Sequence, residues 1–336
     1  MSQEPVVRVG ARGEVASLDG RFCVHPDAPW RLERRDGEQP RVALVLGGGG
    51  SRGAAHVGVL RVLEEQGMKP DLVVGTSMGA VIGALYCAGV PLDEIERTIV
   101  SGEMKRAFMP HPISVQVARN ALKRLFFWRH PFPGVFSGAE VERLVDDLVG
   151  EDHQEIESLV IPFACVAVNI LDGSAYCLAR GDVGRCVRAS SALPPLLKPV
   201  SIGDALYVDG GIRANIPAYA ARQCGADVVV AVNVDEKVRH IEPGVVKTYS
   251  GLANRISSII VALRDARHEE DADIVIQPEL SGISILSFSS ADAERAIREG
   301  EDAARARLYD LKAAFNGGEE SNQIEVGFYH SAPATR

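Results

Sequence analysis

Two glycine-rich turns follow two apolar runs in close succession, and each turn leads into a segment with helical spacing. The first turn spans residues 47–53, directly after the apolar run 42–46, and the second is Gly75-Thr76-Ser77-Met78-Gly79, directly after residues 72–74. A continuous apolar run between turn residues is typical of a strand buried on both faces, which occurs mainly in parallel sheets. An apolar run, a glycine turn and a helical segment thus occur twice in succession. This order indicates strands and helices that alternate around a mostly parallel sheet.

The rest of the chain continues this alternation. A capping box of Ser137 and Glu140 predicts the start of a helix, and Asp172-Gly173 predicts a hairpin turn between two strands. Further strands are expected at 162–170, 175–178, 205–208, 227–234 and 274–276, and helices at 54–66, 78–88, from 91, 183–192, 217–224, 245–269 and 292–314. The predicted fold class is α/β, a three-layer α/β/α sandwich with a mostly parallel central sheet.

Composition divides the chain into three parts. Residues 1–40 are a polar N-terminal extension, residues 41–316 carry the periodic pattern of one domain, and residues 317–336 are a polar, flexible C-terminal tail. The first residues lack a basic stretch followed by an apolar stretch, and the six cysteines form no Cys-x-x-Cys pair. We therefore expect a cytoplasmic protein with reduced thiols, without a secretory signal, a disulfide framework or a zinc site.

Residues 72–90 contain no charged side chain, and their length is close to that of a membrane-spanning helix. Gly75, Gly79 and Gly83 also have the spacing of small residues in packed membrane helices. However, Gly75 and Gly79 bracket a turn. A buried strand followed by a buried helix explains the same residues, and we prefer this interpretation.

Charge is distributed unevenly along the chain. The chain has 45 acidic and 36 basic residues and a net charge of -9, which argues against nucleic-acid binding. Residues 104–133, in contrast, contain Lys and Arg but no Asp or Glu, and they include the aromatic run Phe126-Phe127-Trp128. Such a segment favours peripheral contact with an anionic membrane, here at the inner face. A cap helix with a solvated basic face explains the pattern equally well.

Ser77 lies between Gly75 and Gly79, where a strand is expected to turn sharply into a helix. This pattern is the nucleophile elbow of serine hydrolases, because nothing bulky fits two residues on either side of the turn. A free hydroxyl is a poor nucleophile, so it needs a base and a site for the developing negative charge. A glycine-rich turn with an incidental serine is the alternative interpretation.

The first glycine turn offers donors for an oxyanion. Its spacing also matches a dinucleotide-binding fingerprint, but the next strand ends without an acidic residue, and no Lys-Ser or Lys-Thr pair follows to make a P-loop. What remains is a row of backbone N–H groups at a helix N-terminus, which favours negative charge. The residues expected around the oxyanion are Gly48, Gly49, Gly50, Ser51, Arg52 and Gly53, with Arg52 adding a cation either for the oxyanion region or for structural pairing at the loop.

The proton acceptor for Ser77 has two kinds of candidate. The histidines after Ser77 are His111, His130, His153, His240, His268 and His330, and none lies in a short loop after an apolar strand. Asp209 follows the expected strand 205–208 and precedes Gly210-Gly211, so its carboxylate can approach another loop closely and accept a proton. An ordinary Asp-Gly hairpin turn is the alternative interpretation of this motif.

Four blocks in this order and spacing resemble the patatin-like phospholipase family. They are Gly48-Gly49-Gly50-Ser51-Arg52-Gly53, the Ser77 pentapeptide, Ala189-Ser190-Ser191-Ala192-Leu193-Pro194 and Asp209-Gly210-Gly211. The resemblance covers about residues 41–235. It implies a catalytic domain over 41–316 and a Ser-Asp dyad without histidine, in which Ser77 is the nucleophile and Asp209 the general base. It also implies an oxyanion hole of amides around residues 49–51, with no metal or cofactor.

The resemblance further implies the function of a serine lipid acyl hydrolase in lipid degradation. Its type would be phospholipase A or lysophospholipase, cleaving fatty-acyl esters of phospholipids or other acyl-ester lipids through an acyl-enzyme. Two alternatives remain open at this point. One is a thioesterase or general carboxylesterase on the same dyad, and the other is a non-catalytic lipid-binding module.

Overall fold

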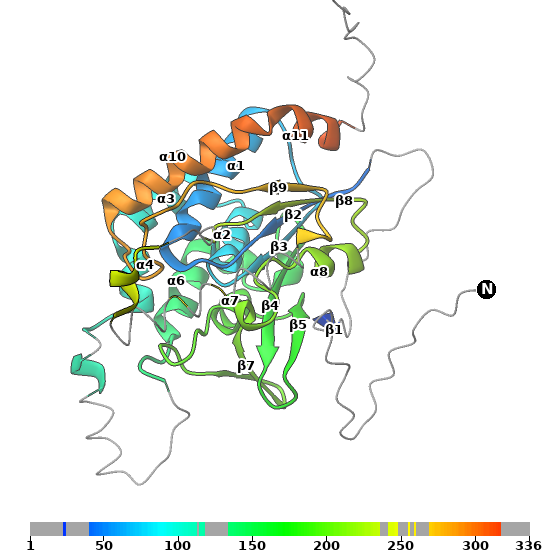
Figure 1. Cartoon of the computed structure of the whole chain (residues 1–336). Helices are drawn as coiled ribbons and strands as arrows, with labels where there is room; N and C mark the ends of the chain where they lie inside the picture. The colour runs from blue at the N-terminus through cyan, green and yellow to red at the C-terminus, as the bar shows by residue number, and fades with distance from the viewer. Residues whose placement is uncertain are drawn as a thin grey trace, which may run out of the picture.

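The computed structural model describes residues 23–24, 40–112, 114–117, 134–235, 241–247, 255, 259 and 269–316. Most of the N-terminal extension, the tail 317–336, residues 118–133 of the basic segment and most of the predicted helix 245–269 lie outside the described residues. Within the described ranges, one mixed sheet carries helices on both faces, as the sequence predicts (Figure 1).

The sheet is mostly parallel. Its order is β1-β5-β4-β3-β2-β8-β9, with β7 paired to β4 and β6 paired to β7. The pairs β1–β5, β2–β3, β2–β8, β3–β4 and β8–β9 are parallel, while β4–β5, β4–β7 and β6–β7 are antiparallel. The strands are β1 (Cys23–Val24), β2 (Val42–Leu46), β3 (Leu72–Thr76), β4 (Phe163–Asn169), β5 (Ser174–Leu178), β6 (Val200–Ile202), β7 (Ala205–Asp209), β8 (Val228–Val232) and β9 (Ile274–Ile276).

Helices cover the sheet on both sides because alternate residues of the central strands face opposite cores. Leu44 of β2 belongs to the larger core, while Ala43 and Val45 belong to the smaller one, which α8 covers. The helices are α1 (Ala55–Glu65), α2 (Met78–Cys87), α3 (Leu92–Val100), α4 (Glu103–Phe108), α6 (Ala139–Val149), α7 (Val183–Ser190), α8 (Ala218–Gln223), α10 (Ser290–Ala306) and α11 (Leu308–Phe315). Short 3₁₀ turns include η1 (Gly50–Ala54) and η4 (Gly210–Ile212).

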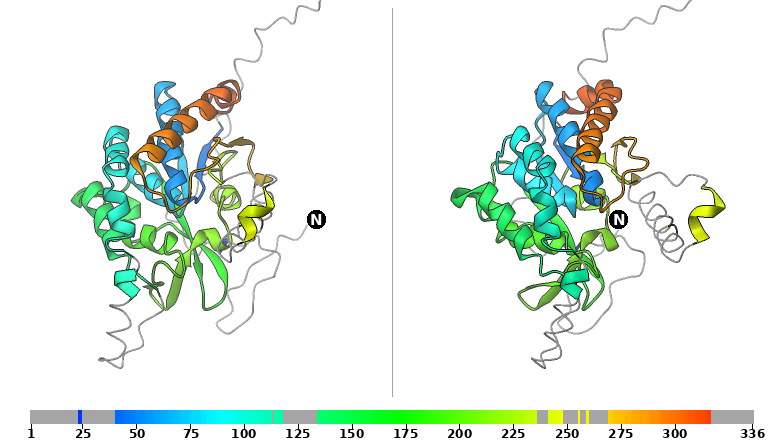
Figure 2. Two further views of the ribbon diagram at one scale, coloured as in Figure 1. Left: turned by 60° about the vertical axis from the view of Figure 1, so that its left-hand side comes forward. Right: turned by 90° about the vertical axis from the view of Figure 1, so that its left-hand side faces the viewer.

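Helix α10 returns from the C-terminal part of the chain to pack along α1 (Figure 2). Two glycines permit this close contact. A Cβ added to Gly58 of α1 would lie 2.0 Å from the carbonyl oxygen of Ile297, and one added to Gly300 of α10 would lie 2.1 Å from that of Ala55. The two helices therefore meet backbone to backbone above the larger core.

The stretch 72–90 is a strand and a helix, as preferred above, rather than one membrane span. It divides into β3 and the 10-residue α2, both fully buried. Among the described residues, none of the helices combines the length and the apolar character needed to cross a bilayer.

The single helix predicted over 292–314 is wrong, because the chain forms two helices, α10 and α11. Arg307 between them has φ -107° and ψ 14°, outside the helical range. Its guanidinium group donates to Asp310 and to the carbonyl oxygen of Val275 in β9, so the break coincides with a contact to the sheet. This contact to the sheet could not be anticipated from local periodicity.

The capping box predicted at Ser137 is also wrong in its details. The residue that precedes α6 is Gly138, with φ 77° and no side-chain cap. The Ser137 hydroxyl instead accepts from the N–H of Ala139 and donates to the Glu140 carboxylate, both at 3.3 Å. The left-handed glycine moves the helix start one residue along the chain, so the Glu140 side chain meets a hydroxyl rather than a backbone N–H.

Candidate active site

Ser77 occupies the sharp turn between β3 and α2. Its backbone has φ 53° and ψ -122°, a conformation that residues other than glycine rarely adopt. The flanking glycines leave room for this turn, since a Cβ on Gly79 would lie 2.1 Å from the carbonyl oxygen of Leu46 and one on Gly75 would lie 2.5 Å from Cα of Ala80. The turn has the strained strand-to-helix geometry of a nucleophile elbow.

The sheet brings Asp209 to Ser77 across 132 positions of sequence. Along one edge of β4, strand β3 pairs with the first half, where Val166 is opposite Thr76, and β7 pairs with the second half, where Ala167 is opposite Asp209, while β5 occupies the other edge. The Ser77 hydroxyl Oγ donates to Oδ2 of Asp209 at 2.7 Å, and the N–H of Gly211 donates to Oδ1 at 2.7 Å. Asp209 is 3% exposed. A buried carboxylate and a hydroxyl are thus held in direct contact.

The histidines within the described residues lie outside the cavity at Ser77. His56, His111 and His153 do not line the cavity at Ser77. His56 is buried in α1, where its Nε2–H donates to the carbonyl oxygen of Gly47, and Nδ1 of His153 contacts the carbonyl oxygen of Ser158. The other histidines after Ser77, namely His130, His240, His268 and His330, lie outside the described residues.

The amides of the first glycine loop fall into two groups. The N–H groups of Gly48, Ser51 and Arg52 donate to the carbonyl oxygens of Asn215, Ile285 and Gly49. Gly49 and Gly50 precede the first helical hydrogen bond of η1, and within the described part of the chain their N–H groups have no protein acceptor. These two amides are therefore available to a ligand.

Arg52 does not point its Nε–H at an oxyanion. This group donates to the carbonyl oxygen of Ile283 at 2.6 Å, and the Ser51 hydroxyl donates to the carbonyl oxygen of Ser284 at 2.5 Å. Together with the Ser51 N–H bond to Ile285, these contacts fasten residues 283–285 to the glycine loop. Of the two roles expected for Arg52, the structural one matches this contact.

A cavity of about 410 Å³ opens beside Ser77 and Asp209. Ser77, Asp209, Gly49 and Gly50 all line it, and the remaining walls are mainly apolar. The apolar side chains come from Phe108, Leu193, Leu196, Leu197, Ile212, Ile285, Leu286 and Phe288. A small polar floor with apolar walls suits an ester attached to a hydrocarbon chain.

Segments distant in sequence build these walls. The Phe108 ring of α4 stacks on the Phe288 ring with centroids 6.0 Å apart. Phe288 has φ 41°, so the backbone is strained where the segment after residue 283 turns into α10. Sequence reasoning assigned no role to this segment, because neither its periodicity nor its composition marks it as part of a site.

Asn215 is a second residue that sequence reasoning missed. Its backbone carbonyl accepts from the Gly48 N–H, and its Nδ2 donates to the Gly48 carbonyl and to the Asp235 carboxylate, the latter at 2.6 Å. Asn215 thus joins the glycine loop, the turn after Asp209 and the end of β8. The sequence offers one signal for this role, an Asn-x-Pro sequence that begins six residues after Asp209.

Comparisons with known proteins agree with this architecture. The family model described as patatin-like phospholipase matches residues 44–222. An uncharacterized NTE family protein of Mycobacterium tuberculosis is 32% identical over 71% of this chain and 63% of its own length. Human patatin-like phospholipase domain-containing protein 6 is 37% identical over 57% of this chain and 13% of its own, and lysophospholipase NTE1 of Debaryomyces hansenii is 34% identical over 57% and 12%.

The chain belongs to the patatin-like phospholipase family. It spans less than two thirds of the length of these relatives. Among solved structures, VipD from Legionella pneumophila is similar with a TM-score of 0.47 and 16% identity, over 82% of this chain and 67% of that one.

Proposed function

We propose that this protein is a serine lipid acyl hydrolase of phospholipase A or lysophospholipase type. The observation that carries the proposal is the 2.7 Å hydrogen bond from Ser77 to the buried Asp209 at an apolar cavity. Membership of the patatin-like phospholipase family supports the same chemistry. The phosphate or alcohol part of the lipid would lie outside the apolar walls, where water can solvate it.

In the acylation step, the Ser77 Oγ attacks the ester carbonyl carbon while Asp209 takes its proton. A tetrahedral intermediate forms, and its negative oxygen needs donors that are already in place. The N–H groups of Gly49 and Gly50 are suited to this task, because both line the cavity and neither is used within the described structure. Asp209 then gives its proton to the leaving alcohol, and the acyl group remains on Ser77.

The deacylation step repeats this sequence with water. Asp209 takes a proton from the attacking water, the Gly49 and Gly50 amides hold the second oxyanion, and the proton returns to Ser77 as the fatty acid leaves. Asp209 alone serves as acid and base, so no imidazole is required. The Gly211 N–H keeps the carboxylate oriented through both steps.

A fluorophosphonate probe tests this assignment, because it labels only an activated serine. Wild-type protein should be labelled and should hydrolyse a chromogenic acyl ester, while Ser77→Ala should do neither. Asp209→Asn cannot accept the proton and should lose about 10²–10⁴-fold in rate. Labelling or hydrolysis of Ser77→Ala at the wild-type rate would refute the proposal, as would an Asp209→Asn variant with full activity.

Paired substrates separate the lipid acyl hydrolase from its alternatives. Oxygen esters and thioesters with the same acyl chain distinguish an esterase from a thioesterase. Diacyl phospholipids and lysophospholipids with matched headgroups then assign the type. Binding of these lipids without turnover would instead indicate a non-catalytic module.

We also propose peripheral contact with anionic membranes through residues 104–133. Within the described part of this segment, Lys105 and Arg106 are exposed on α4, while Phe108 of the same helix lines the cavity. Vesicle co-sedimentation should therefore increase with the anionic lipid fraction and weaken with salt. Equal binding to neutral and anionic vesicles would contradict this proposal.

A further inference from the structure

A short segment at the C-terminal end of α7 contacts the backbone of both members of the proposed dyad. The Ser190 hydroxyl accepts a hydrogen bond from the Ser77 N–H at 3.1 Å. Two residues later, the carbonyl oxygen of Ala192 accepts from the Asp209 N–H at 3.1 Å. The segment Ser190–Ala192 therefore joins the turn that follows β3 to the last residue of β7.

The Ser190 hydroxyl is fully buried, and both of its hydrogen-bonding functions are used. It is 0% exposed, and it donates to the carbonyl oxygen of Val166 at 2.7 Å. Val166 lies in β4, opposite Thr76 in the parallel register. Because the hydroxyl proton is directed at Val166, a lone pair is left for the Ser77 N–H. The chain Ser77–Ser190–Val166 thus ties the elbow to the neighbouring strand.

The backbone conformation of Ser77 requires a stabilising contact of this kind. Backbone conformations like that of Ser77 cost on the order of 1–3 kcal/mol and persist only where surrounding contacts hold them. Without the Ser190 hydroxyl, the Ser77 N–H and the Val166 carbonyl would each lose a partner in a buried place. The backbone of Ser77 would then relax, and its Oγ would move relative to Asp209.

We propose that Ser190 is a positioning residue for the Ser77 nucleophile, and that residues 190–192 set the distance between Ser77 and Asp209. This inference rests on the proposed function. Ser190 acts on the direction of the Ser77 hydroxyl and does not touch the substrate. Its removal should therefore lower kcat and leave KM nearly unchanged.

The test compares Ser190→Ala with Ser190→Cys and with a matched control, Thr98→Val. Thr98 in α3 is also a buried hydroxyl, 3% exposed, and it donates to the carbonyl oxygen of Glu94 within its own helix. We expect Ser190→Ala to lose at least 10-fold in kcat and in fluorophosphonate labelling rate per folded molecule, with KM within twofold. Ser190→Cys, which keeps a weak donor and acceptor, should be intermediate, and Thr98→Val should match wild type.

Wild-type kcat and labelling rate per folded molecule in Ser190→Ala would overturn the inference, and so would an equal loss in Thr98→Val. If Ser190→Ala does not fold, Ser190→Cys is judged by the same two rates. Different results would refute the proposed function and the role of Ser190. An active Ser77→Ala variant refutes the proposed function, whereas an inactive Ser77→Ala with a fully active Ser190→Ala refutes only the role of Ser190.

Discussion

At the scale of single residues, both oxygens of the Asp209 carboxylate have a hydrogen-bond donor. Asp209 uses one carboxylate oxygen for the Ser77 hydroxyl and the other for the Gly211 N–H. Hydrogen bonds to an ionised carboxylate are among the stronger ones in proteins. In this way the carboxylate stays oriented toward the hydroxyl although only 3% of Asp209 is exposed.

His56 carries a pH dependence of stability that is separate from the dyad. Its ring is 0% exposed, its Nε2–H donates to the Gly47 carbonyl, and burial lowers its pKa from 6.5 to about 4. Between these two values the unfolded chain binds a proton that the folded protein does not. The contribution of neutral His56 is therefore complete above pH 6.5 and is lost as the pH falls, by about 3 kcal/mol near pH 4.

Urea unfolding at pH 7 and pH 4.5 measures this effect. A His56→Gln variant should keep a donor for the Gly47 carbonyl and show a smaller drop in unfolding free energy between the two pH values than wild type. His153→Gln, at a partly exposed histidine, is the control and should keep the wild-type drop. An identical pH dependence in His56→Gln and wild type would contradict the prediction.

Short sequence motifs made part of this site predictable. Glycines around Ser77 and after Asp209 leave a local signal, because a tight turn excludes side chains at known positions. Ser190 was marked only as part of a family block, and its contact was not predictable, since its partner Val166 lies in β4. Asn215 was missed for the same reason, because its bonds to Gly48 and Asp235 depend on the fold.

At the scale of secondary structure, the packing of α6 against α7 places a carboxylate in an unfavourable position. Asp146 of α6 lies against Gly184 of α7. Its burial, followed by the nearby charges of Asp182 and Glu142, raises the pKa of Asp146 from 3.8 to about 6. The folded protein thus binds a proton that the unfolded chain releases. This stabilisation is present below pH 3.8 and is lost as the pH rises through about 6.

An Asp146→Asn variant should therefore be more stable than wild type at pH 7.5. The asparagine stays neutral where the aspartate must ionise among other acids. The difference in Tm between the two proteins should shrink as the pH approaches 4, because Asp146 is then protonated. The exposed Glu151→Gln serves as the control and should change Tm little at either pH. An Asp146→Asn variant less stable than wild type at pH 7.5 would show that the charge on Asp146 is not unfavourable.

Central strands were the elements that sequence periodicity predicted best. β2, β3 and β8 are buried on both faces, so their continuous apolar runs are distinctive. The sequence did not predict the short elements α4 and β6, and it placed one helix over 292–314 where there are two. The break at Arg307 coincides with a bond to β9, and the start of α6 follows a left-handed Gly138. Local patterns do not contain contacts of this kind.

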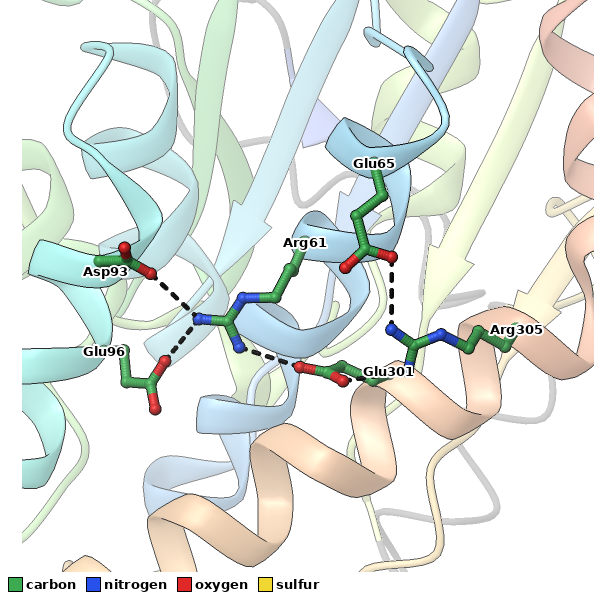
Figure 3. Close-up of polar contacts among 6 residues, drawn as sticks. All are labelled: Arg61, Glu65, Asp93, Glu96, Glu301 and Arg305. Carbon is green, nitrogen blue, oxygen red and sulfur yellow. Dashed lines mark hydrogen bonds and ion pairs between the residues drawn. The ribbon is translucent and has the colours of Figure 1, made fainter.

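At the scale of the whole molecule, an ion-pair cluster joins α1, α3 and α10 (Figure 3). Arg61 of α1 lies at its centre, 2.5 Å from Glu96 and 2.9 Å from Glu301, with its side chain 25% exposed. Arg305 extends the cluster by contacting both Glu301 and Glu65. The cluster connects the outer helices of the N-terminal half to the helix that returns from the C-terminal part.

Replacing Arg61 by Met should leave the partly buried Glu96 without its cation and Glu301 with Arg305 alone. We expect a loss of about 1–3 kcal/mol in unfolding free energy, between the values typical of exposed and of buried ion pairs. The measurement is urea unfolding at low salt and at 1 M salt. Guanidinium chloride is unsuitable as the denaturant because it is itself a salt and screens charges. The loss should shrink at high salt, because salt screens the remaining charges.

Arg97→Met is the matched control for this experiment. Arg97 pairs with Glu94 on the same helix, and its side chain is 70% exposed. Its removal should change the unfolding free energy by less than about 0.5 kcal/mol. Equal losses in the two variants would show that the Arg61 cluster adds nothing beyond an ordinary surface pair.

The bonds from Ser51 and Arg52 to residues 283–285 have a consequence for biosynthesis. These partners are more than 230 positions apart, as the separations of 233 and 231 residues show. A ribosome therefore synthesises the glycine loop more than 230 residues before the segment that fastens it. A nascent polypeptide that ends between the two contains the loop without the contacts that hold it in place.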